Sequence, residues 1–196
     1  MQLDADGWVV DPEVTKHPFP NLKHGTITAI DGIIVHQTDS PNRDATFNSY
    51  AGKAPNGAHF LIDKNGDVYQ TASMHWELWH VGQLQARCLL SHSCPPTELA
   101  AIKKWDAAAV HKIEKKKAFP DRFPMNDDSI GIEIVGYHVE TEKGVTYEPV
   151  TPEQNTSLTR LVAGLKMVLN FPTIEIYRHP AVGVKNPHEA ETAKWD

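Results

Sequence analysis

The stretch that decides the fold is "SIGIEIVG", residues 129–136. Ile130, Ile132 and Ile134 alternate with Glu133, which is the period-two pattern of a β-strand. The isoleucines face a hydrophobic core, so Glu133 lies on the other face of an otherwise apolar strand. A carboxylate in such a place is costly unless it is paired. Glu133 is therefore a candidate functional residue, and a structural ion pair is the alternative.

Further strands are predicted on both sides of this segment. The β-branched run "DGIIVHQT" at 31–38 is typical of a buried strand. In "AHFLIDKNGDVYQTA", at 58–72, two alternating apolar runs flank Asn65 and Gly66. This pair favours the type I′ turn of a β-hairpin. A last strand, "TIEIYRH" at 173–179, carries His179 at its C-terminal end.

One long helix is predicted between these strands. Thr151 opens the motif "TPEQ", in which proline takes the first helical position and glutamine completes a capping box. Apolar residues then follow at helical spacing, and Pro172 is expected to end the helix. This spacing is carried by Leu158, Leu161, Val162, Leu165 and Val168.

Strands mixed with helices predict an α/β (α+β) fold, in which helices flank a central mixed β-sheet. The 196 residues are expected to form a single domain, 1–196. A partly helical insertion occupies approximately residues 84–128. Within it, Cys88 and Cys94 form either a small disulfide loop or two free thiols, and the sequence leaves both open.

Composition excludes several classes of protein. Apolar content of 40% and charged content of 22% are typical of a soluble globular domain. The net charge of −6 argues against a nucleic-acid partner, and the basic run at 111–117 is expected to be a solvated helix face. We expect no signal peptide and no membrane insertion. The chain is therefore expected to be made in the cytoplasm.

Three histidines are predicted to converge. His36 lies near the end of the first strand, His179 at the end of the last strand, and His188 in the closing loop. Three protein ligands with a fourth position for water are what a catalytic zinc ion needs. Because the chain has 11 histidines, each one alone is more often a surface residue or a core residue with its own hydrogen-bond partners.

Five segments strengthen this interpretation when they are taken in order: "IIVHQT", "GAHFLIDKNGDVYQ", "LWHVGQ", "SIGIEIVG" and the closing "RH…K…H…W". Their order resembles the zinc-dependent N-acetylmuramoyl-L-alanine amidases, a family shared with phage lysozyme-type amidases and peptidoglycan-recognition proteins. The resemblance runs from about Gly32 to Trp195, apart from the insertion. It implies the amidase fold and a Zn²⁺ cofactor.

The resemblance also implies the metal ligands. It makes His36 and His179 two of them. The family has an Asp or Cys as third ligand, a few residues before an aromatic, and counting back from Trp195 places His188 there. Histidine binds zinc well, although it would leave three neutral ligands around the metal. Glu189 and Glu191 remain as alternatives for this position.

Further roles follow from the same resemblance. Glu133 matches the carboxylate that acts as general base, and Lys185 resembles the lysine that stabilises the oxyanion. His80, Trp79 and His59 match positions that line the site and are expected to contact substrate, although His59 is also typical of a packed strand residue. The segment from about Gln83 to Asp128 is expected to line or cover the substrate groove, or to be an ordinary surface insertion. Its anchors would be Trp105, Phe119 and Phe123.

The reaction that the resemblance implies is hydrolysis of the amide between N-acetylmuramic acid and the L-alanine of the stem peptide. Peptidoglycan or muropeptides are the expected partners, and an inhibitory or immunity protein is a further candidate. A peptidoglycan-binding module without activity and a different metal hydrolase are the alternatives. An injected antibacterial effector or a phage lysis enzyme fits the insertion better than a cytoplasmic recycling amidase does. Such a protein would act on the wall in the periplasm after specialised export or release.

Overall fold

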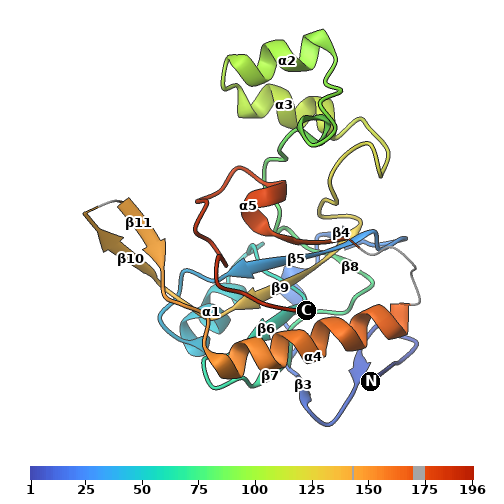
Figure 1. Ribbon diagram of the computed structural model, residues 1–196. Coiled ribbons are helices and arrows are strands. Elements are labelled where there is room, and N and C mark those ends of the chain that lie inside the picture. The colour runs from blue at the N-terminus through green and yellow to red at the C-terminus, as the bar shows by residue number, and fades with distance from the viewer. Residues whose placement is uncertain (143, 170–174) are drawn as a thin grey trace.

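The centre of the protein is a six-stranded mixed β-sheet, seen in a computed structural model that describes residues 1–142, 144–169 and 175–196 (Figure 1). Its strands stand in the order β12-β5-β9-β6-β7-β3. Only β6 and β7 pair antiparallel; every other neighbouring pair in this sheet is parallel. The strands are β3 (Val14–Lys16), β5 (Gly32–Gln37), β6 (Phe60–Ile62), β7 (Val68–Gln70), β9 (Ser129–Ile134) and β12 (Glu175–Arg178). The predicted α/β fold with a mixed sheet is confirmed.

The predicted hairpin is present as β6 and β7, but its turn is not of type I′. Gly66 has φ of +89°, while Asn65 is absent from the residues with positive φ, and a type I′ turn needs positive φ at both central residues. The backbone N–H of Gly66 instead donates to the carbonyl of Asp63, at 2.9 Å. The loop is longer than two residues, so glycine alone supplies the left-handed conformation.

Helix α4 (Pro152–Leu169) covers one face of the sheet. Its predicted capping box is confirmed, because Thr151 Oγ1 accepts from the N–H of Gln154 at 3.1 Å and Gln154 Oε1 accepts from the N–H of Thr151 at 3.0 Å. The predicted stop at Pro172 lies outside the described residues. The apolar side chains of α4 pack against alternate residues of the central strands, namely Ile33, Val35, Phe60, Ile62, Ile130, Ile132 and Ile134.

The opposite face of the sheet holds helix α1 (Arg43–Tyr50), whose first turn is capped by the side chain of Asn42. Tyr50 is fully buried here beside Leu22, Ala72 and Leu78. Because side chains alternate along a strand, β9 turns its isoleucines toward α4 and Glu133 toward α1. The sheet thus places its hydrophobic core on one side and the polar Glu133 on the other.

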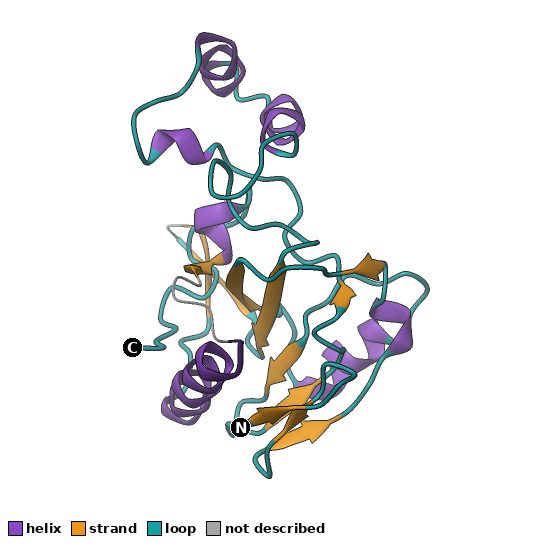
Figure 2. Ribbon diagram, turned by 90° about the vertical axis from the view of Figure 1, so that its right-hand side faces the viewer, coloured by secondary structure: helices purple, strands orange, loops and turns teal. Residues whose placement is uncertain are grey.

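The insertion projects from the body of the molecule (Figures 1 and 2). It contains the 3₁₀ turn η2 (Arg87–Leu89), helix α2 (Pro96–Lys103) and helix α3 (Ala107–Glu114). Cys88 and Cys94 form a disulfide. The sulfurs belong to a small separate cluster with Ala86, Val110, Ala101 and Ile102. A core of this size is the kind that a disulfide commonly supplements.

Short elements complete the chain. The sequence analysis predicts neither the edge strand β3 of the central sheet nor the hairpin formed by β10 and β11. No helix among the described residues is long and apolar enough to cross a membrane. The remaining elements are β1 (Gln2–Leu3), β2 (Val9–Val10), η1 (Pro20–Leu22), β4 (Gly25–Thr26), β8 (Trp76–Glu77), β10 (His138–Thr141), β11 (Gly144–Tyr147) and α5 (His179–Val182).

Candidate active site

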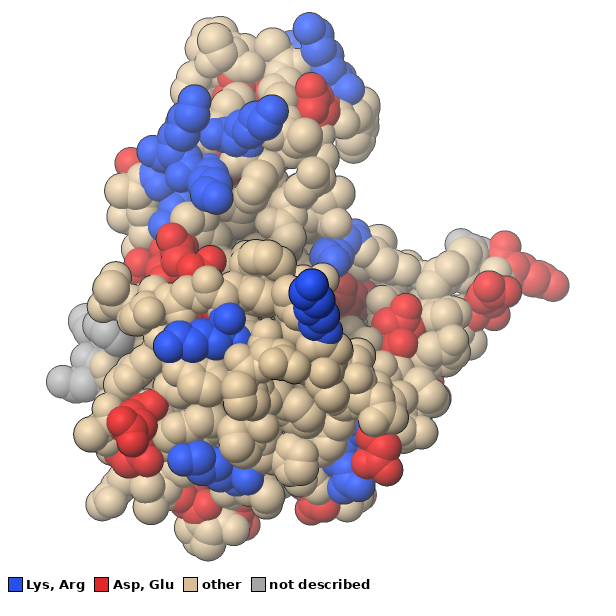
Figure 3. Space-filling view, turned by 180° about the vertical axis from the view of Figure 1, so that it is seen from behind, with Lys and Arg blue, Asp and Glu red and all other residues tan. Residues whose placement is uncertain are grey.

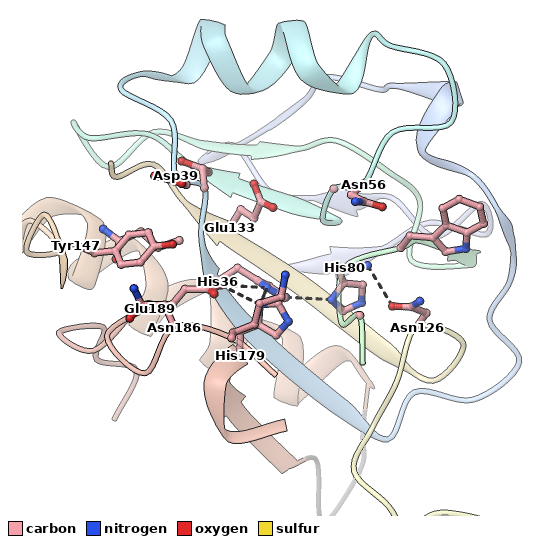
Figure 4. A pocket seen from close by; sticks show the side chains of 16 residues that line it. His36, Asp39, Asn56, His80, Asn126, Glu133, Tyr147, His179, Asn186 and Glu189 are labelled. Carbon is pink, nitrogen blue, oxygen red and sulfur yellow. Dashed lines mark hydrogen bonds and ion pairs between the residues drawn. The ribbon is translucent and has the colours of Figure 1, made fainter. Parts of the chain in front are cut away.

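A polar cavity of about 560 Å³ opens at the C-terminal ends of β5 and β12 and beside β9 (Figure 4). Parallel strands bring their carboxyl ends to one edge of a sheet, which is the usual place for a site in such folds. Most of the predicted site residues reach this cavity. It is lined by His36, Gln37, Thr38, Asp39, Asn56, Gly57, Trp79, His80, Gly82, Asn126, Glu133, Tyr147, His179, Lys185, Asn186 and Glu189.

Three side chains bring one ligand atom each to a common point. His36 Nδ1 lies 2.9 Å from His179 Nδ1, and Glu189 Oε1 lies 2.9 Å from His179 Nδ1 and 3.6 Å from His36 Nδ1. Atoms that bind zinc tetrahedrally, at about 2.0–2.1 Å, lie roughly 3.3 Å from one another. All three side chains are buried. This donor set fits a zinc ion.

The outer nitrogens of the two imidazoles fix their orientation. His179 Nε2 donates to the carbonyl of Val81 at 2.8 Å, and His36 Nε2 lies 3.0 Å from His80 Nδ1. His80 Nε2 in turn lies 3.3 Å from Ser129 Oγ, whose hydroxyl donates to the carbonyl of Met125.

Following the donors along this chain leaves a lone pair on both Nδ1 atoms. Two lone pairs that face each other at 2.9 Å beside a carboxylate need a proton or a cation between them. Burial, followed by the charge of His179, lowers the pKa of His36 to about 4. The neutral imidazole is the form that binds a metal.

Glu133 stands on β9 in the same cavity (Figure 4). Burial raises its pKa to about 7, and the charge of Glu189 acts in the same direction. The Tyr50 hydroxyl donates to Glu133 Oε2 at 2.7 Å and opposes this shift. Tyr50 could not be found from the sequence, because nothing in the pattern of α1 indicates that its last residue reaches a strand carboxylate.

The structure does not bring His188 to the cluster. Its side chain is 44% exposed, and its Nδ1 lies 2.8 Å from Glu191 Oε2 at the surface. Asn186 sets this turn, because its side chain accepts from the N–H of His188 and its carbonyl accepts from the N–H of Glu189. The turn points Glu189 inward and His188 outward. Glu189, one of the two alternatives, therefore stands where His188 was expected.

The remaining predicted residues divide into two groups. Lys185, His80 and Trp79 line the cavity, and Trp79 stacks on His24 with ring centroids 3.7 Å apart. His59 does not line it. The side chain of His59 is fully buried, its Nε2 pairs with the carbonyl of Trp76, and its Nδ1 accepts from the N–H of Gly131. It is a packed residue whose two ring nitrogens are both used.

The insertion contributes little to this cavity. Asn126 is the only one of its residues that lines it, among those the structure describes. Asn126 accepts hydrogen bonds from the N–H groups of His80 and Val81. Of the expected anchors, Phe123 is buried in a cluster with Ile34, Phe119 is half-buried, and Trp105 is 93% exposed. None of the three lines the catalytic cavity. Phe123 is wrong as an anchor for substrate because its side chain is buried, and Trp105 lines a separate groove.

Comparison with solved structures supports the fold. A crystal structure of an AmpD derivative has a TM-score of 0.53 and 19% identity, over 93% of this chain and 88% of that chain. The amidase LysC from Clostridium intestinale URNW has a TM-score of 0.52 and 18% identity, over 89% and 87%. AmpDh3 from Pseudomonas aeruginosa, in complex with anhydromuramic pentapeptide, has a TM-score of 0.50 and 16% identity, over 93% and 58%.

No curated protein sequence matches the chain. The family model described as N-acetylmuramoyl-L-alanine amidase matches residues 26–196. This range holds every strand of the central sheet except β3 and every residue of the cavity. The chain belongs to the N-acetylmuramoyl-L-alanine amidase family.

Proposed function

We propose that this amidase is a zinc hydrolase that cleaves the amide between the lactyl group of N-acetylmuramic acid and the L-alanine of the stem peptide. The observation that carries the proposal is the convergence of His36 Nδ1, His179 Nδ1 and Glu189 Oε1 beside Glu133. His36, His179 and Glu189 would hold the metal, with Glu189 in place of His188. Glu189 also supplies a negative charge, which a third histidine would lack.

Zinc, when bound, polarises a carbonyl and lowers the pKa of a water molecule. The side chains of the cavity perform the rest of the reaction. Glu133 accepts a proton from the attacking water and passes it to the nitrogen of L-alanine as the C–N bond breaks. The Lys185 ammonium compensates the negative charge that develops on the carbonyl oxygen. The products are a muramic acid carboxylate and a peptide with a free amine.

Three variants test the proposal. Glu189→Ala should lose both zinc and activity, whereas the matched variant His188→Ala, next to it in the chain, should keep both. Metal analysis of the purified proteins measures the first effect, and release of stem peptide from muropeptides measures the second. Zinc-loaded, active Glu189→Ala protein would show that another residue is the third ligand.

Glu133→Gln should keep its zinc and its fold while losing about 10²-fold or more of the rate, because the general base is removed. A near-normal rate would point to another base in the cavity, with His80 the next candidate. A zinc-loaded wild-type protein that binds muropeptides without cutting them would instead identify a binding module.

A further inference from the structure

An apolar groove of about 640 Å³ lies between the insertion and the body, next to the catalytic cavity. Aliphatic side chains form most of its wall, and Trp105 stands at it with 93% of its surface exposed. Leu89 and Val184 are also about half exposed. An exposed apolar surface of this kind usually marks a binding site. The aliphatic wall includes Leu84, Leu89, Ile102, Val110 and Val184.

Only a thin ridge separates the groove from the catalytic cavity. Residues 83–85 pair with residues 182–184, through hydrogen bonds of 2.8 and 2.9 Å and a bridge between Leu84 and Gly183. Val184 lines the groove and the next residue, Lys185, lines the cavity. Paired strands lie about 4.8 Å apart. An extended peptide of five residues spans roughly 17 Å, so it can cross this ridge while its first amide lies in the cavity.

The surface around the groove is basic in an acidic protein. Residues 84–128 carry eight Lys or Arg and six Asp or Glu residues, whereas the whole chain has 19 and 25. Of the six acids, Glu98 and Glu114 are buried against Lys117, and Asp128 is buried against Arg122. Figure 3 shows Lys and Arg side chains gathered on the projecting part of the molecule.

The exposed lysines of the insertion supply this charge. Asp106 also lines the groove, and its carboxylate caps α3 by accepting from the N–H of Ala109. Lys103 lines the groove as well, and Lys104 follows it. The structure gives neither of them a carboxylate partner within the described part of the chain. The remaining exposed lysines are Lys112, Lys115 and Lys116.

We propose that this groove, which we call the Trp105 groove, binds the part of the acidic stem peptide that lies beyond the scissile amide. The inference rests on the proposed function. Stem peptides combine carboxylates with alanine methyl groups, which match the lysines and the aliphatic wall. The uncharged sugar would instead contact the aromatic side chain of Trp79, which lines the catalytic cavity. Through this groove the insertion makes the enzyme prefer long stem peptides to short ones.

The test compares two substrates that share one scissile bond: N-acetylmuramoyl dipeptide, which is too short to cross the ridge, and N-acetylmuramoyl pentapeptide. The double variant Lys103→Ala/Trp105→Ala should lose about tenfold in kcat/KM on the pentapeptide, mainly through KM, and should cut the dipeptide as the wild type does. Both side chains are exposed, so the fold should be retained. The matched control Lys166→Ala/Met167→Ala removes an exposed lysine and an exposed apolar residue from α4. It should leave kcat/KM unchanged on both substrates.

Equal losses on both substrates, or no loss on the pentapeptide, would overturn the inference. Binding of the pentapeptide to the Glu133→Gln protein, with and without the groove substitutions, separates the groove from the reaction. Weaker pentapeptide binding after the groove substitutions supports the groove as a peptide-binding site. Failure of the wild type to cut either substrate would contradict the proposed amidase reaction, but it would not contradict this binding result. Anionic phospholipid vesicles are the second probe. Loss of vesicle binding with unchanged pentapeptide binding would assign the groove to a membrane surface and reject the stem peptide.

Discussion

At the scale of single residues, the hydrogen bond from Tyr50 to Glu133 joins a buried helix residue to the proposed general base. The bond is 2.7 Å long and lowers the pKa of a carboxyl group that burial raises. It also holds one carboxylate oxygen of Glu133 and leaves the other for water. Tyr50 is therefore a positioning residue that acts on the reaction through Glu133.

Tyr50→Phe should move the acidic limb of the pH–rate profile to higher pH. Removing the donor raises the pKa of Glu133, and the base works only when it is deprotonated. The rate should fall about tenfold at pH 6 and recover toward the wild-type rate at pH 9, with zinc content unchanged. A loss of equal size at every pH would indicate that Tyr50 serves packing alone. The profile of kcat against pH is the measurement.

At the scale of elements, α2 and α3 are joined by a buried group of charges. Lys117 Nζ lies 2.5 Å from Glu114 Oε1 and 2.9 Å from both oxygens of Glu98. The N–H of Arg87 also donates to Glu114. One ammonium group thus faces two carboxylates. Burial raises the pKa of Glu114 to about 7, and the neighbouring carboxylate of Glu98 acts in the same direction. The pKa of Glu98 is lowered.

The stability of the insertion should therefore fall as the pH rises from about 4.5 to about 7. Over this range the folded form keeps a proton on Glu114 that the unfolded form has released, so the contribution is complete below pH 4.5 and is lost above pH 7. The lowered pKa of Glu98 acts below this range. Glu114→Gln mimics the protonated side chain and should abolish the dependence of the insertion's stability on pH over this range.

Amide hydrogen exchange in residues 96–114 measures this effect, with variant and wild type compared at the same pH. The ratio of their rates should be near one at pH 5, and the variant should exchange about tenfold more slowly at pH 8. A ratio that does not change with pH would contradict the assignment. Exchange in the central sheet provides the internal control.

At the scale of the whole molecule, the proposed reaction predicts what the protein does when it reaches the wall. Fusion of a signal peptide should make it lytic to the bacteria that export it, while production without the fusion should be tolerated. The same fusion carrying Glu133→Gln should be exported without lysis, because the wall amide stays intact. Culture density after induction is the readout. Harmless export of folded, zinc-loaded protein would favour a recycling enzyme that acts on small soluble fragments.

An inhibitory partner protein and the compartment in which the chain works stay predictions.

Much of the fold could be predicted from the sequence by itself. The alternation in "SIGIEIVG" determined that Glu133 faces away from the isoleucine core, and the structure agrees. The motif "TPEQ" determined the start of α4. The sequence also indicated that His36 lies near the end of one strand and His179 at the end of another, and in the structure His36 lies in β5 and His179 directly follows β12. These inferences rest on local periodicity, which covalent geometry imposes on every strand and helix.

The tertiary structure alone decided which loop residue completes the cluster. His188 and Glu189 are neighbours, both can bind zinc, and no periodicity applies in a closing loop. Hydrogen bonds to Asn186 set the turn that sends Glu189 inward and His188 to the surface. Long-range packing likewise brought Tyr50 to Glu133 across 83 positions of sequence and buried His59 between Trp76 and Gly131. The orientation of such side chains depends on contacts between distant segments, and a linear pattern carries no record of them.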